Sequence, residues 1–397
     1  MGNVCVEQNG KPGRIDAGCG GTMSRFDVLV PEHIRTLASY KPGKPLKQAE
    51  RECGVVCSKM ASNENPLGPS PRAVEAMREA APFVHLYPDN DATELRNLIA
   101  ERFDMKPEQV LVTGGSTQFI DIIAHSLLSP GLNAVTSERS FLAYAMATQA
   151  AGGTLRQVPM QANTFNLDAL LAAIDQNTRV VFIANPNNPT GTMLDSQQVT
   201  RFLDRVPSNV LVVLDEAYYE FADYLARQRG VEYSRSLEYV REERNVVVLR
   251  TFSKVQGLAG CRVGYGFGPT ELIEYFARGR TAFSISVFAE AAAIAALVDE
   301  EHTQKTVENN AAGVAWMENQ LAEMGLPVTP TWANFVYVDV GEDASVIGQR
   351  MQQQGIIVRP LGMWGAPQTI RITIGTPEQN AKCMEALKKA LARVVTS

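Results

Sequence analysis

Lys254 is the residue whose type and position in this 397-residue chain most clearly suggest covalent chemistry. It follows the apolar, β-branched run 246–249, which predicts a buried strand, so the lysine is expected where that strand ends. Thr251 and Ser253 precede it, and Arg262 lies eight positions after it. A lysine amine can form a Schiff base with a carbonyl cofactor, while hydroxyl groups and a guanidinium can hold a phosphate. The segment therefore predicts an anchor for a phosphorylated carbonyl cofactor.

Two further predicted strands end in polar side chains. The run 180–184 precedes a turn that contains Asn188, and the run 210–214 leads into Asp215, with Tyr218 shortly after it. Ligands of α/β folds bind at the carboxyl ends of parallel strands, so we expect these side chains to meet the lysine at one edge of a sheet. Each motif alone is also common in turns and helix ends. Their combination is what favours a site.

A glycine-containing turn after another predicted strand is suited to an anion. The run 110–113 is followed by Gly115, Ser116 and Thr117, and then by apolar residues at helical spacing over 119–128. Glycine lets the backbone approach a ligand closely, and the N–H groups and dipole of a helix N-terminus favour negative charge. We expect the phosphate of the cofactor to bind here.

The segment around Lys254 and the order of these motifs resemble fold type I pyridoxal-phosphate aminotransferases, over nearly the whole chain from about Phe26. The resemblance implies an α/β fold with a large doubly wound, mostly parallel sheet domain and a smaller α/β domain. It implies that Lys254 binds pyridoxal 5'-phosphate covalently and moves a proton. The resemblance also implies that Asp215 pairs with the pyridine nitrogen of the cofactor, and that Asn188 and Tyr218 hold its phenolic oxygen.

The implied cofactor-binding set is Gly115, Ser116, Thr117, Phe141, Asn188, Asp215, Tyr218, Thr251, Ser253, Lys254, Arg262 and, reaching the phosphate bound by a neighbouring subunit, Tyr87. Phe141 falls where relatives place an aromatic ring that stacks on the pyridine. Tyr144 is the competing choice, and either residue could belong to the core.

Five stretches narrow the resemblance to the histidinol-phosphate aminotransferase branch: 62–71, 87–89, 333–335, 355–359 and 371–376. In that branch Arg371 matches the arginine for the anionic group on the substrate's Cα, and Arg359 matches a second arginine for the substrate phosphate. A dianionic phosphate suits two guanidinium groups, whereas one satisfies a carboxylate. A surface salt bridge is the alternative for Arg359. Tyr40, Asn65 and Asn188 complete the implied substrate-binding set.

The chain departs from the branch at the phosphate turn, where 113–118 reads Thr-Gly-Gly-Ser-Thr-Gln, and after Phe283, where Ser284 replaces a frequent asparagine. We expect transamination of L-histidinol phosphate with 2-oxoglutarate, giving imidazole acetol phosphate and glutamate in histidine biosynthesis. The alternatives are an aromatic amino acid (phenylalanine/tyrosine) aminotransferase, which would leave Arg359 idle, and a decarboxylase of an O-phospho amino acid. A non-catalytic, regulatory protein on the same fold is a further alternative, but such proteins usually carry a DNA-binding domain, for which we expect no room here.

Composition sets broader limits. The net charge of −6, with no basic run, argues against nucleic acid as a partner, and no stretch is apolar enough to predict a membrane span. The six cysteines are scattered, which favours a reducing cytoplasm, and the four histidines complete no metal-ligand set. We expect small-molecule partners, an amino donor and a 2-oxo acid, no metal, and a homodimer with shared active sites because Tyr87 is expected to cross the interface.

The predicted domains are an N-terminal extension and arm at 1–58, a large cofactor-binding domain at 59–295 and a small C-terminal domain at 296–397. The first 22 residues are polar and without period, and are interpreted as a disordered extension or as residues before the native start. The 45% apolar content is enough for a sizeable core.

Overall fold

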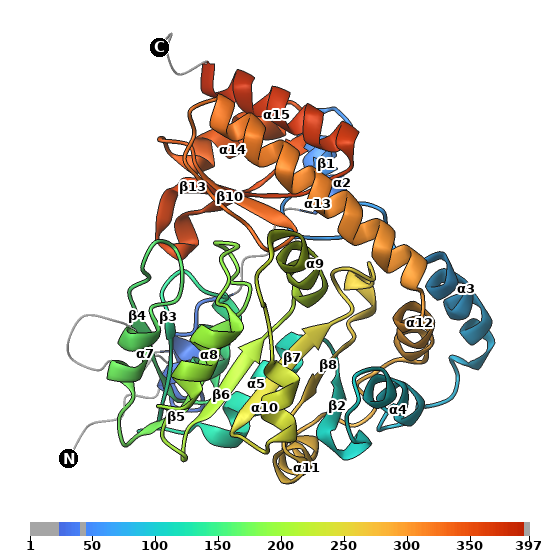
Figure 1. Cartoon of the computed structure of the whole chain (residues 1–397), viewed down its shortest axis with the longest axis vertical. Helices are drawn as coiled ribbons and strands as arrows, with labels where there is room; N and C mark the ends of the chain where they lie inside the picture. Colours follow the sequence, from blue (N-terminus) through green and yellow to red (C-terminus); the bar gives the residue numbers. More distant parts are fainter. Residues whose placement is uncertain (1–23, 40–44, 393–397) are drawn as a thin grey trace, which may run out of the picture.

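The computed structural model describes residues 24–39 and 45–392, and it contains two α/β domains, one above the other in Figure 1. The larger, lower domain is built on a seven-stranded sheet with the order β2-β8-β7-β6-β5-β3-β4. The smaller, upper domain is built on a four-stranded sheet with the order β12-β13-β10-β9. The predicted fold class is confirmed.

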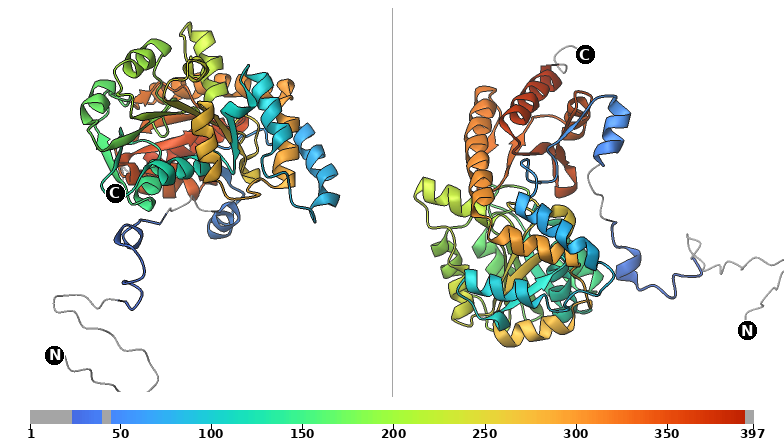
Figure 2. Two further views of the ribbon diagram at one scale, coloured as in Figure 1. Left: turned by 90° about the horizontal axis from the view of Figure 1, so that it is seen from below. Right: turned by 90° about the vertical axis from the view of Figure 1, so that its right-hand side faces the viewer.

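The large sheet is parallel apart from β8, which pairs antiparallel with both β7 and β2. Every residue of β6 and β7 is buried, because helices cover both faces of the sheet (Figures 1 and 2). This is why these strands read as continuous β-branched runs. The strands are β2 Val110–Thr113, β3 Asn133–Ser137, β4 Thr154–Val158, β5 Thr178–Ala184, β6 Leu211–Asp215, β7 Val246–Thr251 and β8 Gly264–Phe267.

The helices of the large domain bury apolar residues against this sheet. In α5, which starts at Ser116 directly after β2, the positions Phe119, Ile120 and Ile123 are fully buried at helical spacing. The helices are α3 Pro71–Ala80, α4 Thr93–Arg102, α5 Ser116–Leu127, α6 Leu142–Ala150, α7 Leu167–Ala173, α8 Ser196–Leu203, α9 Tyr219–Arg229, α10 Ser236–Arg241, α11 Thr270–Arg278 and α12 Val287–Leu297. Three 3-10 turns lie at Ala81–Phe83, Pro107–Gln109 and Ala259–Cys261.

The small domain packs three helices against its antiparallel sheet, with Val314, Val336, Ile347, Ile372 and Leu387 in its core. Its elements are α13 Glu300–Glu323, β9 Val328–Thr329, β10 Phe335–Asp339, α14 Ala344–Gln352, β11 Ile356–Ile357, β12 Arg359–Leu361, the 3-10 turn η4 Gly362–Trp364, β13 Ala366–Thr373 and α15 Pro377–Ala392. The long α13 starts beside α3 and runs up into this domain (Figure 1).

Part of the predicted N-terminal arm belongs with the small domain. The arm contains α1 Glu32–Arg35, α2 Leu46–Cys53 and β1 Ser58–Lys59. β1 pairs in parallel with β11, and Ala49 of α2 packs with Cys57 and Ile357. The boundaries at 58/59 and 295/296 remain predictions, but α2 and β1 complete the small domain rather than preceding it.

Within the described ranges, no helix has the length and apolar character needed to cross a bilayer. The same residues contain no group of three or more histidine, cysteine or acidic side chains placed to bind a metal ion.

Candidate active site

A cavity of about 310 Å³ lies where the carboxyl edge of the large sheet meets the small domain. Ala184, Asp215 and Thr251 are the last residues of β5, β6 and β7, and all three line it. The small domain contributes Arg359, Trp364 and Arg371 to the opposite wall. The predicted strand-end residues therefore meet in one cavity at the edge of the sheet, where α/β folds bind their ligands.

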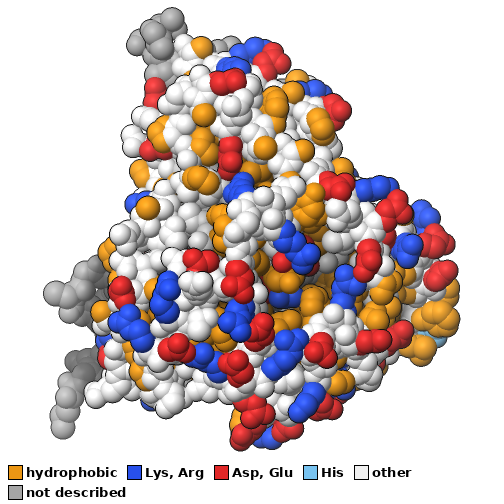
Figure 3. Space-filling view, in the orientation of Figure 1, with side chains coloured by type: hydrophobic (Ala, Val, Ile, Leu, Met, Phe, Trp, Pro, Cys, Tyr) orange, Lys and Arg blue, Asp and Glu red, His pale blue; other side chains and the backbone are white. Residues whose placement is uncertain are grey.

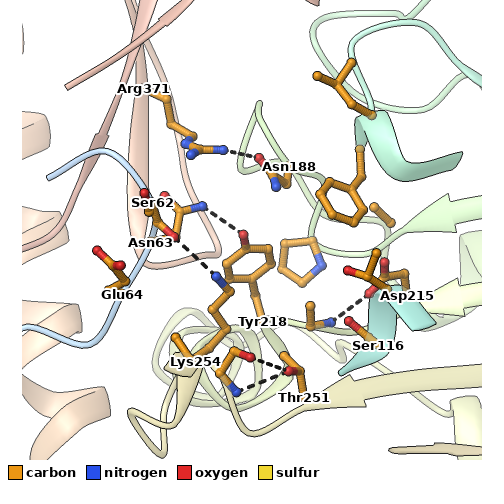
Figure 4. Close-up of a pocket in the computed structure, with 18 of the residues that line it drawn as sticks. Ser62, Asn63, Glu64, Ser116, Asn188, Asp215, Tyr218, Thr251, Lys254 and Arg371 are labelled. Carbon is orange, nitrogen blue, oxygen red and sulfur yellow. Dashed lines mark hydrogen bonds between the residues drawn. The ribbon is translucent and has the colours of Figure 1, made fainter. Parts of the chain in front are cut away.

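Lys254 lies in the turn between β7 and β8, with its amine inside the cavity (Figure 4). The amine donates to the carbonyl of Ser62 at 3.4 Å. Burial lowers the pKa of Lys254 to about 8, and the positive charge of Arg371 adds to this effect. Because a larger share of the amine is neutral near neutral pH than for an exposed lysine, Lys254 can act as a nucleophile or a base.

Asp215 lies across the cavity from Arg371 in Figure 4, with its side chain almost completely buried. Burial raises the pKa of Asp215 to about 6, although hydrogen bonds from the Tyr144 hydroxyl at 2.8 Å and the Ala217 N–H at 3.2 Å oppose the rise. The carboxyl is thus mostly ionised at neutral pH and can accept a hydrogen bond from a protonated ring nitrogen.

The structure shows which of the two aromatic candidates, Phe141 and Tyr144, faces the cavity. Phe141 lines the cavity, whereas Tyr144 is fully buried behind it, stacked on Phe182 with ring centroids 4.8 Å apart. Tyr144 supports the site through its hydrogen bond to Asp215 and an edge-on contact with Phe141, with ring centroids 5.7 Å apart. Phe141 is therefore the ring that can contact a ligand, and Tyr144 positions the carboxylate.

Hydroxyl and N–H groups form an anion-binding corner at the start of α5. Ser116 and Thr117 line it together with Thr251, Ser253 and Arg262, the last of which donates to Ser253 Oγ at 3.5 Å. Gly115 lies beside this corner with φ +87°, and a Cβ there would come within 2.7 Å of Arg262 Nη2. The corner thus requires glycine, and its donors match the phosphate of the cofactor that the sequence implies.

A pair of arginines forms the wall contributed by the small domain. Arg359 and Arg371 are direct partners across β12 and β13, and both line the cavity. Arg371, 5% exposed, donates to Asn188 Oδ1 and, at 2.8 Å, to the carbonyl of Ala61. The guanidinium of Arg359 lies 5.5 Å from the ring of Trp364. Like charges directly opposite one another on neighbouring strands are unfavourable, so the pair suits a bound anion.

The whole cavity has an excess of positive charge. Four basic side chains line it, Lys254, Arg262, Arg359 and Arg371, against two carboxylates, Asp215 and Glu64. A cofactor phosphate together with a second anionic group would balance these charges. The residues present therefore fit a phosphorylated cofactor and an anionic substrate.

Residues 56–387 match the model of the family described as aminotransferase class I and II. The chain belongs to this family.

Relatives with known names agree with the assignment. The chain is 46% identical over 370 residues to a histidinol-phosphate aminotransferase of Akkermansia muciniphila, covering 92% of this chain and 99% of the relative. It is 43% identical over 371 residues to histidinol-phosphate aminotransferase 2 of Pseudomonas fluorescens, covering 93% and 99%. Among solved structures, the histidinol-phosphate aminotransferase of Sinorhizobium meliloti in complex with pyridoxal-5'-phosphate matches with a TM-score of 0.84 at 29% identity, covering 94% of this chain and 99% of that one.

This class I and II aminotransferase has cavity residues that the sequence analysis did not single out. Asn63 is 1% exposed with φ +57°, and its amide donates to the hydroxyl of Tyr218 at 2.8 Å. Ser62, Glu64 and Trp364 also line the cavity. The only sequence signal for Asn63 is its type, because asparagine tolerates the left-handed backbone better than most residues do.

Asn65, which the resemblance implied for substrate binding, is not among the cavity-lining residues. Its amide donates to the carbonyl of Val255 at 2.8 Å and to Thr306 Oγ1 at 3.1 Å. The bond to Val255 joins the segment 61–65 to the lysine turn, and the substrate-binding role of Asn65 stays a prediction.

Four predicted residues remain: Asn188, Tyr218, Tyr87 and Tyr40. Asn188 and Tyr218 line the cavity as expected. Tyr87 does not, since it is 83% exposed and stacks on Phe283 with ring centroids 4.7 Å apart. Its predicted role in a neighbouring subunit's site is untouched by this. Tyr40 lies outside the described residues.

Proposed function

We propose that this chain is a pyridoxal-phosphate-dependent aminotransferase that converts L-histidinol phosphate and 2-oxoglutarate to imidazole acetol phosphate and glutamate in histidine biosynthesis. The observation that carries the substrate assignment is the pair Arg359 and Arg371, side by side on the cavity wall. The names of relatives that are 43–46% identical over nearly their full length support it.

Pyridoxal 5'-phosphate supplies an aldehyde carbon that reacts with amines and a pyridine ring that withdraws electrons. The residues expected to hold it lie on the large-domain side of the cavity. Ser116, Thr117, Thr251, Ser253 and Arg262 bind the phosphate, with Gly115 leaving space for it.

The ring of the cofactor has its own set of contacts. Asp215, held by Tyr144, keeps a proton on the ring nitrogen, and Phe141 packs on the ring face. Asn188 and Tyr218 hold the phenolic oxygen, and Asn63 fixes the hydroxyl of Tyr218.

Lys254 is the covalent anchor and the base. Its lowered pKa, about 8, provides neutral amine for attack and for removing the proton from the substrate's Cα. The carbonyl of Ser62 accepts a hydrogen bond from the amine at 3.4 Å and orients it. The same amine would then give the proton back at the carbon of the cofactor's aldehyde group.

The arginine pair binds the substrate phosphate, which lies next to Cα in histidinol phosphate. Arg371 is fixed by Asn188 and by the Ala61 carbonyl, whereas Arg359 is supported by the ring of Trp364. Two guanidinium groups provide enough N–H donors for a dianion, whereas a monoanionic carboxylate needs only one of them.

The substrate assignment is tested with purified holoenzyme and 2-oxoglutarate, measuring glutamate formation from histidinol phosphate, histidinol, phenylalanine and O-phosphothreonine. Histidinol is the matched control, because it lacks only the phosphate. We expect histidinol phosphate to have the highest kcat/KM by at least about 30-fold over histidinol, since losing charge-assisted bonds to a buried partner costs ~2–5 kcal/mol. A preference for phenylalanine would replace the proposal with an aromatic aminotransferase.

We further infer a homodimer with shared active sites. Phe83, Val84, Leu86, Tyr87 and Phe283 form an apolar surface, each between 45% and 83% exposed. Apolar side chains gather at the right-hand edge of Figure 3, over the segment that follows α3. A contiguous apolar patch favours a protein interface, and a second copy of the chain would bring Tyr87 to the neighbouring phosphate corner.

The dimer is tested by mixing two inactive variants, Tyr87→Ala and Lys254→Ala. If Tyr87 acts in the partner's site, exchanged heterodimers contain one intact site and recover part of the activity. Sedimentation measures the oligomeric state and confirms exchange. A monomer, or exchange without recovery, would rule out shared sites.

A further inference from the structure

Cys53 and Cys57 hold their sulfur atoms 3.3 Å apart, outside the active-site cavity. α2 ends at Cys53, and Gly54, with φ +71°, turns the chain back so that Cys57 returns beside the helix end. Glu50 fixes this turn, since its backbone carbonyl accepts from the N–H of Gly54 at 2.9 Å and its carboxylate accepts from the N–H of Cys57 at 3.2 Å. Both sulfurs also contact the carbonyl of Val55, at 3.6 Å from Cys53 and 3.5 Å from Cys57, so the turn itself brings the two thiols together.

We propose that Cys53 and Cys57 form a dithiol site that a small-molecule disulfide oxidises reversibly to an intramolecular disulfide. A disulfide bond is about 2.0 Å long, so the sulfurs need to approach by only about 1.3 Å. Neither cysteine has a role in the proposed transamination.

The burial of the two cysteines determines which thiol reacts first. Cys53 is half-buried and Cys57 is buried. Burial raises the pKa of Cys57 to about 11, and the neighbouring Cys53 and Glu50 contribute to the rise. Cys53 is thus the thiol that an incoming disulfide reaches first.

The exchange has two balanced steps. The Cys53 thiolate attacks one sulfur of a small disulfide, whose S–S bond breaks and releases one thiol. The Cys57 thiolate then attacks the Cys53 sulfur of the mixed disulfide and releases the second thiol. After the first step Cys53 no longer carries a thiolate charge, so that charge no longer contributes to the raised pKa of Cys57. Two protein thiols are oxidised and one small disulfide is reduced.

The site is joined to the cavity by β1 and by the packing of Cys57 with Ala61. In Figure 2, α2 lies on the outer side of the small domain. β1 is held by bonds from Ser58 N–H to the Gly355 carbonyl at 2.7 Å and from Met60 N–H to the Ile357 carbonyl at 2.8 Å. Both cysteines pack in one apolar cluster with Ala61, which lines the cavity, and the bonds of β1 hold this segment in place while the sulfurs close the short gap between them.

The test uses full-length protein, glutathione disulfide as oxidant, and peptide masses after alkylation and trypsin digestion. Cleavage after Arg51 and Lys59 gives a peptide, 52–59, that contains both cysteines. We expect this peptide to carry no alkyl group and to be two hydrogen atoms lighter than its unmodified dithiol form, and to carry two alkyl groups when dithiothreitol is added before alkylation. Wild type that keeps two alkylated thiols, or that stops at a glutathione mixed disulfide, would overturn the proposal.

Three variants distinguish the two thiols. Cys57→Ser should stop at a mixed disulfide on Cys53, whereas Cys53→Ser should leave the buried Cys57 reduced. Cys261→Ser, which removes a half-buried thiol elsewhere, should oxidise at 52–59 like wild type. Faster reaction at Cys57 than at Cys53 would contradict the assigned order.

Transaminase activity measured after oxidation tests whether Cys53 and Cys57 are already placed to form a disulfide. Because the sulfurs move little, oxidised wild type should keep kcat/KM within about twofold of the reduced protein. This readout depends on the proposed transaminase activity, whereas the peptide masses do not, so the two ideas fail separately. A loss of tenfold or more, reversed by dithiothreitol and absent in Cys53→Ser, would show that closure distorts the wall and that the geometry is not preformed.

Discussion

The two walls of the cavity are built in different ways. The large-domain wall consists of strand ends and the turns that follow them, so Asp215, Thr251 and Lys254 owe their places to neighbouring strands of one sheet. The small-domain wall combines Arg359 and Arg371 with the segment 61–64, which is joined to them by hydrogen bonds rather than by a common strand order.

We therefore expect the large-domain wall to carry the reacting groups and the small-domain wall to select the substrate. This sheet edge is rigid because β6 and β7 are paired on both sides and buried throughout, and it suits groups that must hold a cofactor in one orientation. The opposite wall is assembled from separate segments, and its polar groups can change with the substrate while the sheet edge is kept. We expect substitutions on the first wall to abolish all turnover and substitutions on the second to change the choice of substrate.

The largest effect is expected for Lys254→Ala. Removing the only amine at the proposed anchor should lower kcat by at least about 1,000-fold for every donor and eliminate the visible absorbance change on adding the cofactor, with the fold retained. Steady-state rates, absorbance and circular dichroism measure the three outcomes. Activity within tenfold of wild type would mean that this wall is not the reacting one.

Asp215→Asn should rank second. The amide keeps the size of the carboxylate but cannot hold a positively charged ring nitrogen, so kcat should fall by at least about 100-fold for all donors. Cofactor affinity should change much less, because the phosphate corner is intact; equilibrium dialysis measures it. A loss mainly in affinity would make Asp215 a structural residue.

Arg359→Ala should affect one substrate and spare another. Losing a charge-assisted contact to a phosphate costs ~2–5 kcal/mol, so kcat/KM for histidinol phosphate should fall by roughly 30-fold or more. Any turnover of phenylalanine should change little, and Arg359→Lys should recover part of the loss because it restores the charge without the fork. Equal losses for both substrates would place Arg359 in the scaffold.

The smallest effect is expected for Trp364→Phe. The ring that supports Arg359 is kept, but the hydrogen bond from Trp364 Nε1 to the Ser140 carbonyl at 3.0 Å is lost. One neutral hydrogen bond contributes about 0.5–1.5 kcal/mol, so KM for histidinol phosphate should rise by roughly 2- to 10-fold with kcat nearly constant. An effect on kcat as large as that of Asp215→Asn would erase the distinction between the walls.

Most of the cofactor wall could be predicted from the sequence, because its signals are local. A β-branched run predicts a strand, and the polar residue that follows must lie at the sheet edge, which is how Asp215 and Lys254 were found. Gly115 was predicted for close approach, and the structure adds the reason, a φ of +87° beside Arg262. Local sequence signals could not decide between Phe141 and Tyr144, because both lie at the start of the same helix.

Sequence by itself determined the order of strands and helices and the residues at the strand ends, since backbone periodicity and turn chemistry act over a few positions. Only the tertiary structure decided which side chains of 61–65 face the cavity, and it assigned Asn63 to the site and Asn65 to a supporting bond. It also brought Trp364 to Ser140, 224 positions away, and the sulfur of Cys57 to that of Cys53. Such contacts depend on how separate segments pack, and several residues of equal local propensity compete for each of them.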